Sequence, residues 1–316
     1  MNRRAFLGAT AATVLHDLRA NSAQIPIIDC HIHLFDTARP QGVPWPDKNN
    51  KVLYQPALPE RYRKIAVPLG IAGAIKVEAS PWLEDNQWAL DVAAKDSIIV
   101  GVVGNLEPGK ADFARHLERF QRNPLFRGIR YGNLWSRDFT AQVRREDFIS
   151  HVKLLSRAEL SLDTANPTPA LIADVIRLTD EVPGLRVIID HLPQLRVPAD
   201  AAARRVYQSH LLEIGKRPQI YVKISEVLRR VDGEVPTDLS FYRGTLDEIF
   251  GVFGEDRVIF GSDWPNSDLW KPYPDVLRIV QDFFGTKGPV AAEKYFWRNS
   301  VKAYRWLKRD ASQPGA

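Results

Sequence analysis

Two histidines one residue apart are the first residues of this sequence whose types and spacing suggest chemistry. His31 and His33 lie in IIDCHIHLFD, residues 27–36, directly after a short apolar run. Side chains two positions apart on a strand point to the same face, so both imidazoles can meet at one point. Convergent imidazole nitrogens are suitable ligands for a divalent metal ion. A surface or packing role is the alternative for such a pair.

Other polar side chains occur where further short apolar runs end. Each has a plainer interpretation: His191 as a hydrogen-bonded core residue, Asp263 as a turn or helix-capping acid, and Arg130 as an ion-pair residue. The coincidence of histidines and an acid at the first, sixth and eighth run ends argues that they share one site. The polar residues at the later run ends are Lys76, Glu78, Arg127, Arg130, Asp163, Asp190, His191, Lys223, Ser225, Glu226 and Asp263.

These residues can form one site only in a fold that brings the ends of the apolar runs together. Eight short apolar runs alternate with helix-like patterns such as residues 111–122 and 167–178. This alternation predicts an α/β fold, a single-domain (β/α)8 TIM barrel, whose catalytic groups lie at the C-terminal ends of the strands. An open doubly wound sheet is the alternative, but no glycine-rich phosphate turn follows the first run. The eight runs are residues 25–30, 71–77, 98–103, 126–130, 160–163, 186–190, 220–224 and 258–262.

Composition places the chain among ordinary globular proteins. It has 316 residues, of which 45% are hydrophobic and 26% charged. The net charge of +5 is too small to indicate nucleic-acid binding. The one cysteine, Cys30, is expected to be a packed strand residue. Three histidines among charged neighbours in helical patterns are expected to be solvated: His116, His151 and His210.

Two segments depart from the barrel pattern. Residues 1–23 begin with a twin arginine in RRAFLG and resemble a twin-arginine export signal, which predicts a periplasmic or exported protein with a domain at residues 24–310. A cytoplasmic protein is the alternative. The apolar run at residues 5–15 is too short to span a bilayer, so no membrane insertion is expected. Residues 37–70 are proline-rich and irregular, as in a lid or rim loop.

Five short motifs together resemble a known family. IDCHIHLFD, GIR, IDHLP, VKIS and FGSDWP are similar to motifs of the amidohydrolase superfamily, in the amidohydrolase-related branch that includes sugar-lactone and 2-pyrone-4,6-dicarboxylate lactonases. The resemblance extends from about residue 25 to 307. It implies a hydrolase on a TIM barrel whose mouth binds a small molecule.

The resemblance also implies roles for individual residues. The implied metal ligands are His31, His33, His191 and Asp263. The implied catalytic residues are Asp263, His191 and Arg130, and the substrate-binding residues are Arg130, Lys223, Glu78 and Trp264. Tryptophans in or beside the expected mouth loops suggest a sugar-stacking wall: Trp45, Trp135, Trp264 and Trp270.

The fifth strand departs from the family pattern. Metal-dependent members usually present a histidine there, whereas this chain has LSLDT, ending at Asp163 and Thr164. The resemblance therefore implies a divalent ion, with zinc favoured, and the missing histidine leaves open whether the reaction requires it. Glu78 and Asp163 are the substitute ligands that the sequence offers.

The expected reaction is the opening of a lactone, of a sugar acid or a related carboxylated ring, by activated water. One alternative is a metal-dependent decarboxylase of an aromatic or unsaturated acid. Another is an exported binding protein that has lost catalysis.

Overall fold

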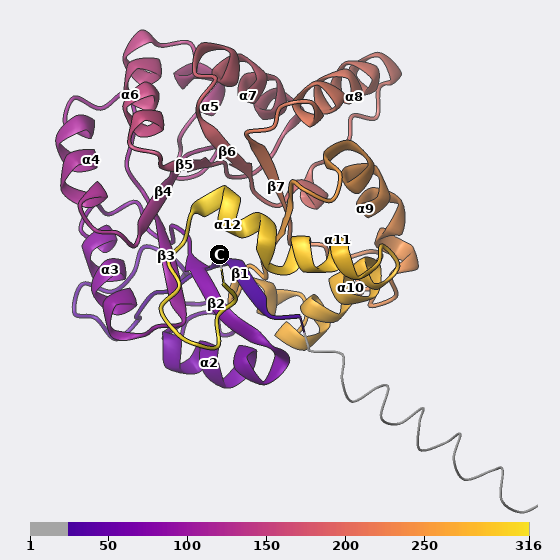
Figure 1. Cartoon of the computed structure of the whole chain (residues 1–316), viewed down its shortest axis with the longest axis horizontal. Helices are drawn as coiled ribbons and strands as arrows, with labels where there is room; N and C mark the ends of the chain where they lie inside the picture. Colours follow the sequence, from indigo (N-terminus) through magenta and orange to yellow (C-terminus); the bar gives the residue numbers. More distant parts are fainter. Residues whose placement is uncertain (1–24, 316) are drawn as a thin grey trace, which may run out of the picture.

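The computed structural model describes residues 25–315, so the predicted export signal at residues 1–23 lies outside the described residues. Eight parallel strands follow one another in the order of the chain, and the prediction of a (β/α)8 barrel is confirmed (Figure 1). The strands are β1 (Ile27–Ile32), β2 (Ile71–Lys76), β3 (Ile99–Gly104), β4 (Phe126–Arg130), β5 (Ser161–Asp163), β6 (Arg186–Ile189), β7 (Ile220–Ile224) and β8 (Val258–Phe260).

Helices surround the strands, as near-continuous apolar runs require of a sheet covered on both faces. The α7 helix illustrates why the sequence forms them: the Thr168 hydroxyl caps it by accepting from the Leu171 amide at 3.1 Å, and Pro169 occupies its first turn. The helices are α2 (Pro59–Ala66), α3 (Asp85–Lys95), α4 (Phe113–Gln121), α5 (Phe139–Gln142), α6 (Glu146–Arg157), α7 (Pro169–Glu181), α8 (Ala201–Gly215), α9 (Ser240–Phe253), α10 (Tyr273–Gly285), α11 (Pro289–Glu293) and α12 (Asn299–Tyr304).

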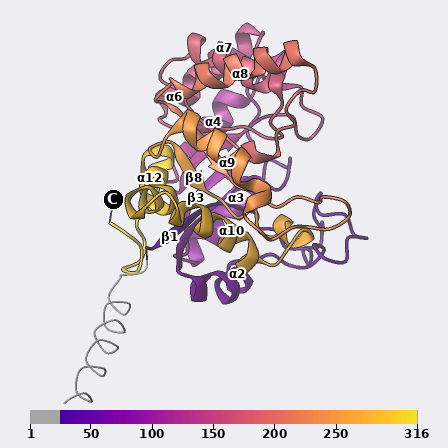
Figure 2. The ribbon, with the colours of Figure 1, turned by 90° about the vertical axis from the view of Figure 1, so that its right-hand side faces the viewer.

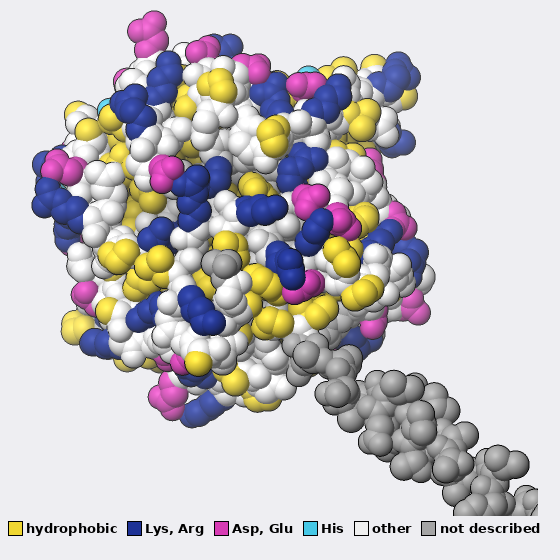
Figure 3. All heavy atoms as spheres, viewed as in Figure 1, with side chains coloured by type: hydrophobic (Ala, Val, Ile, Leu, Met, Phe, Trp, Pro, Cys, Tyr) yellow, Lys and Arg dark blue, Asp and Glu magenta, His cyan; other side chains and the backbone are white. Residues whose placement is uncertain are grey.

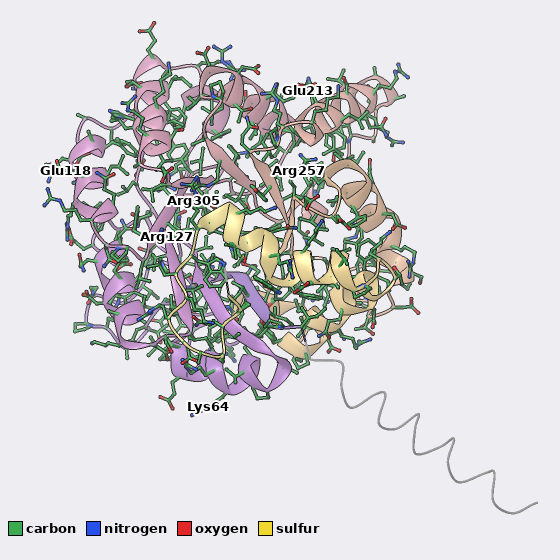
Figure 4. All side chains as sticks on the ribbon, in the orientation of Figure 1. Lys64, Glu118, Arg127, Glu213, Arg257 and Arg305 are labelled. Atoms are coloured by element: carbon green, nitrogen blue, oxygen red, sulfur yellow. The ribbon has the colours of Figure 1, made fainter. Side chains whose placement is uncertain are left out.

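One end of the barrel is closed by the C-terminal segment. Tyr304 and Trp306 are buried there and pack with the apolar side chains of the strand interior, which include Ile28 and Ile259. Figure 2 shows α12 and the C-terminus at this end and long loops at the opposite end. At the closed end, Arg127 of β4 donates to the carbonyl of Arg305 at 3.1 Å (Figure 4). Ligand access is therefore left to the opposite, C-terminal ends of the strands.

The segment expected to be irregular, residues 37–70, contains a helix. Pro59 starts α2, and Tyr62 and Ala66 are buried along one of its faces. The irregular part is therefore residues 37–58, and the prediction was wrong for the remainder because a short amphipathic helix packs there.

The seam between β1 and β8 closes the barrel. The Asp263 amide donates to the His31 carbonyl at 2.8 Å, and the His33 amide donates to the Trp264 carbonyl at 2.7 Å. Asp29 completes the seam, since its buried carboxylate accepts from the Ser262 amide at 2.8 Å. The same carboxylate also accepts from other buried donors: the Tyr62 hydroxyl at 2.9 Å, the Tyr273 hydroxyl at 2.8 Å and the His31 amide at 3.2 Å.

The face drawn in Figure 3 agrees with the modest net charge. On the face drawn in Figure 3, basic and acidic side chains are interspersed. Among the described residues, none of the helices has the length and apolar character needed to cross a membrane.

We predict that Asp29→Ala lowers the free energy of unfolding by about 3 kcal/mol or more, because several buried donors lose their acceptor at once. Urea unfolding followed by circular dichroism measures this. Asp36→Ala is the matched control, since among the described residues the half-buried Asp36 side chain accepts from the nearby Ala38 amide alone. Equal stability of the two variants would contradict a structural role for the Asp29 carboxylate.

Candidate active site

Three side chains meet at the open end of the seam. The Nε2 atoms of His31 and His33 lie 3.3 Å apart. Oδ1 of Asp263 lies 3.4 Å from the first and 3.0 Å from the second. The expectation that the two imidazoles converge opposite this acid agrees with these distances. His191 lies alongside, with its Nε2 atom 3.8 Å from the same carboxylate oxygen.

Local hydrogen bonds orient the imidazoles. Nδ1 of His33 lies 3.2 Å from the Val77 carbonyl, which can only accept, so Nδ1 carries the proton and Nε2 keeps its lone pair. Nδ1 of His191 lies 2.8 Å from the Ser225 hydroxyl. Each ring therefore turns its Nε2 edge toward Asp263.

Three residues of the site have left-handed backbone conformations. The φ angles are 53° at His191, 48° at Glu226 and 60° at Asp263. Such angles are uncommon for residues with side chains and are held only where the surroundings enforce them. They occur where β6, β7 and β8 have just ended, and they accompany side chains that face the cavity at the mouth.

A buried ionic cluster lies below the imidazoles. The Lys223 ammonium is fully buried and lies 2.8 Å from Asp163 and 2.9 Å from Asp190. It also lies 3.1 Å from Nδ1 of His31. Burial alone would lower the pKa of Lys223, but the two carboxylates outweigh that effect and raise it, so the ammonium stays charged. Lys223 thus holds the His31 ring from behind.

Arg130 links this cluster to the open mouth. Its Nε lies 3.0 Å from Oδ2 of Asp190, and the side chain is 7% exposed. It also lines the cavity, so the guanidinium is fixed on one side by Asp190 and faces ligand space on the other.

A cavity of about 220 Å³ opens above these groups. Sequence reasoning did not assign Glu226 or Asn266 to the site, although Glu226 stood in the VKISE run end. The Asn266 amide donates to Oδ2 of Asp263 at 2.6 Å and to Glu226 at 3.0 Å. The lining residues are His33, Trp45, Glu78, Ala79, Arg130, Leu134, Trp135, Asn166, His191, Glu226, Asp263 and Asn266.

Two residues expected to bind substrate lie outside the cavity. Lys223 is 0% exposed within the ionic cluster below. Trp264 is also 0% exposed, because the seam directs its ring outward against Tyr62, with ring centroids 5.2 Å apart. The structure thus places both away from the cavity, whereas Glu78 and Arg130 of that set line it. Of the four tryptophans, Trp45 and Trp135 line the cavity.

The substitute metal ligands are also placed elsewhere. Asp163 is engaged by Lys223 and by the Tyr304 hydroxyl, which donates at 2.5 Å. Glu78 accepts from Arg137 at 2.9 Å on the other wall of the mouth. Among the described residues, the groups spaced to hold an ion are His31–His33–Asp263, His31–Asp190–His191 and His191–Glu226–Asp263.

Burial sets the protonation states at the mouth. It lowers the pKa of His33 to about 3 and places those of His31 and His191 well below the ordinary value, so all three imidazoles are neutral. Burial raises the pKa of Asp263 to about 6, which leaves the carboxylate ionised at neutral pH. The site therefore presents one anionic base among neutral rings.

Residues outside the site give two corrections and one agreement. His116 and His151 were expected to be solvated. His116 is 9% exposed, with its ring nitrogen 3.6 Å from the Asp112 carboxylate. The half-buried His151 ring stacks on Phe113, and its Nδ1 accepts from the Gly109 amide at 2.9 Å. Cys30 is buried, as expected for a packed strand residue.

The fold and site define a TIM-barrel protein with a polar centre at its mouth, and the family and relatives that it matches make it a hydrolase. A family model described as Amidohydrolase matches residues 28–306, and the chain belongs to this amidohydrolase family, as the motifs implied.

Individual relatives agree with this family. An L-fucono-1,5-lactonase from Burkholderia ambifaria is 28% identical over 284 residues, which covers 88% of this chain and 95% of the relative. A second L-fucono-1,5-lactonase, from Burkholderia multivorans, is 25% identical over 85% of this chain and 92% of the relative. The crystal structure of an amidohydrolase from Burkholderia multivorans with bound zinc has the same fold, with a TM-score of 0.78, 22% identity, and coverage of 89% of this chain and all of that one.

We predict that Lys223→Met destabilises the protein by about 3–5 kcal/mol, because two buried carboxylates lose their shared cation. Chemical denaturation measures the change. Lys64→Met provides the control, since Lys64 forms an exposed pair with Glu60 that contributes little. If both variants unfolded at the same urea concentration, the buried cluster would not stabilise the barrel.

Proposed function

We propose that this enzyme opens the lactone of a sugar acid with water activated at the barrel mouth. The observation that carries the proposal is the ionised Asp263 carboxylate beside three neutral imidazoles, in a small cavity that His33, His191 and Arg130 also line. Two relatives that bear the name L-fucono-1,5-lactonase support a lactone as the substrate.

Asp263 acts as the base in this proposal. Asn266 holds Oδ2, which leaves Oδ1 facing the imidazoles and the cavity. Oδ1 accepts one proton as water attacks the lactone carbonyl and a new carbon–oxygen bond forms. The ring carbon–oxygen bond then breaks, and Asp263 returns that proton to the departing alkoxide. The product is an open hydroxy acid, whose carboxyl group releases one proton to solvent.

The neighbouring groups stabilise the charge that develops on the carbonyl oxygen. The buried Arg130 guanidinium and the His191 imidazole act strongly here because the site excludes most water and the groups need no reorganisation. Arg130 is fixed by Asp190, and His191 by Ser225. His33 does not contribute in this way, because its proton is held by the Val77 carbonyl and its Nε2 keeps a lone pair.

The donor set at the seam fits a zinc ion, which we include in the proposal. Nε2 of His31, Nε2 of His33 and Oδ1 of Asp263 are 3.0–3.4 Å apart. Ligands about 2.0–2.1 Å from a tetrahedral zinc ion have this spacing. Bound zinc would lower the pKa of water toward about 7.

Metal analysis after chelation and zinc repletion tests the assignment: we expect bound zinc in the wild-type chain and its loss in His33→Ala.

Export is the remaining part of the proposal. The twin arginine at Arg3 and Arg4 and the short apolar run after it support a periplasmic location. Recovery of the protein in the periplasmic fraction of its source cells tests this, and recovery in the cytoplasmic fraction alone would contradict it.

We predict that Asp263→Asn lowers kcat/KM for aldonolactone hydrolysis at least about 100-fold, because the amide cannot accept the proton from water. A pH-indicator assay over a panel of aldonolactones measures proton release. Asp268→Asn is the control, because Asp268 follows in the same loop and pairs with Arg61 at 3.3 Å. Near-wild-type turnover of Asp263→Asn would remove this carboxylate from the chemistry. Carbon dioxide release without lactone opening would identify a decarboxylase instead.

A further inference from the structure

Two polar atoms of cavity-lining residues are buried without a hydrogen-bond partner among the described residues. They are Oε2 of Glu78 and Nε1 of Trp135, and both residues line the cavity. An unpaired buried carboxylate oxygen or indole N–H costs free energy unless another molecule pairs with it. The mechanism above uses neither atom, so their partner is to be sought in the ligand.

Glu78 is fixed in place from behind. Its other oxygen accepts from Arg137 at 2.9 Å, and the Glu78 side chain is 0% exposed. The Arg137 guanidinium is itself buried and stacks over the Tyr131 ring at 5.1 Å. One carboxylate oxygen is therefore committed to the protein, and the other remains as an acceptor for a hydroxyl group.

Trp135 lines the same cavity and is held in a strained conformation. Its φ is 57°, and that of the following Ser136 is 60°. For a bulky side chain, a left-handed backbone is an outlier that persists only under constraint. The strained turn lies in the loop after β4, and the ring that it carries lines the cavity with an unpaired donor. Trp45 adds a second aromatic surface to the same cavity.

We propose that Glu78 and Trp135 form a subsite that binds a ring hydroxyl of a polyhydroxylated lactone. The inference rests on the proposed lactonase function and specifies its substrate. One ring hydroxyl donates to Oε2 of Glu78, and the same or the neighbouring hydroxyl accepts from Nε1 of Trp135. The apolar face of the ring lies against the tryptophans, as sugars commonly do on aromatic side chains.

The test compares two neutral substrates on the same enzyme preparation, a polyhydroxylated δ-lactone and unsubstituted δ-valerolactone. We expect Glu78→Gln to lower the ratio of their kcat/KM values about 10-fold or more, because a hydrogen bond to a charged acceptor is lost for the first substrate only. This ratio does not depend on how much of the variant is folded. Glu107→Gln is the matched control, since Glu107 approaches the same Arg137 at 3.9 Å from a more exposed position.

An unchanged ratio in Glu78→Gln would overturn the subsite while leaving the lactonase function in place.

If no lactone were hydrolysed, the proposed function would fail, and calorimetric binding of a neutral polyhydroxylated lactam would then test the subsite separately. Binding that weakens about 10-fold or more in Glu78→Gln supports the subsite. Equal binding by both proteins, or no binding by either, overturns it.

Discussion

Closure of the barrel between its first and last strands is the constraint on which the rest of the structure depends. The two backbone hydrogen bonds of that seam are made by His31, His33, Asp263 and Trp264, three of which carry the polar centre. Asp29 secures the seam from outside with a carboxylate that four donors share. Formation of the fold and assembly of the site are therefore one event, because the segments lie more than 200 residues apart and meet only when the barrel closes.

Three layers follow along the barrel axis. The closed end is filled by apolar side chains and the C-terminal segment, the middle by the Lys223 cluster, and the mouth by the cavity. A buried ion pair is costly to desolvate, so the middle layer is a weak source of net stability. We infer that its value lies in orientation: Lys223 contacts His31, and Asp190 fixes Arg130. The layer thus places the groups above it at defined positions.

Much of this architecture was predictable from residue patterns, and the exceptions have physical causes. Side chains alternate along a strand, and the parallel strands of a barrel present their C-terminal ends at one mouth. These two rules were enough to predict that His31, His33, His191 and Asp263 lie together. The pattern does not say how far below the mouth a side chain lies along the barrel axis. Lys223 was therefore expected at the mouth, whereas it lies in the buried layer below it. Trp264 was misplaced because seam pairing turns it outward. Loop residues such as Asn266 and Arg137 reach the site through tertiary contacts that no local periodicity reveals.

The most direct measurement is hydrolysis of a neutral aldonolactone in water enriched in oxygen-18, followed by mass spectrometry of the product. If the groups at the seam direct water onto the lactone carbonyl, each product molecule carries one heavy oxygen, located in its carboxyl group. Product with the heavy oxygen on the ring-derived hydroxyl, or conversion without any incorporation, would contradict this chemistry.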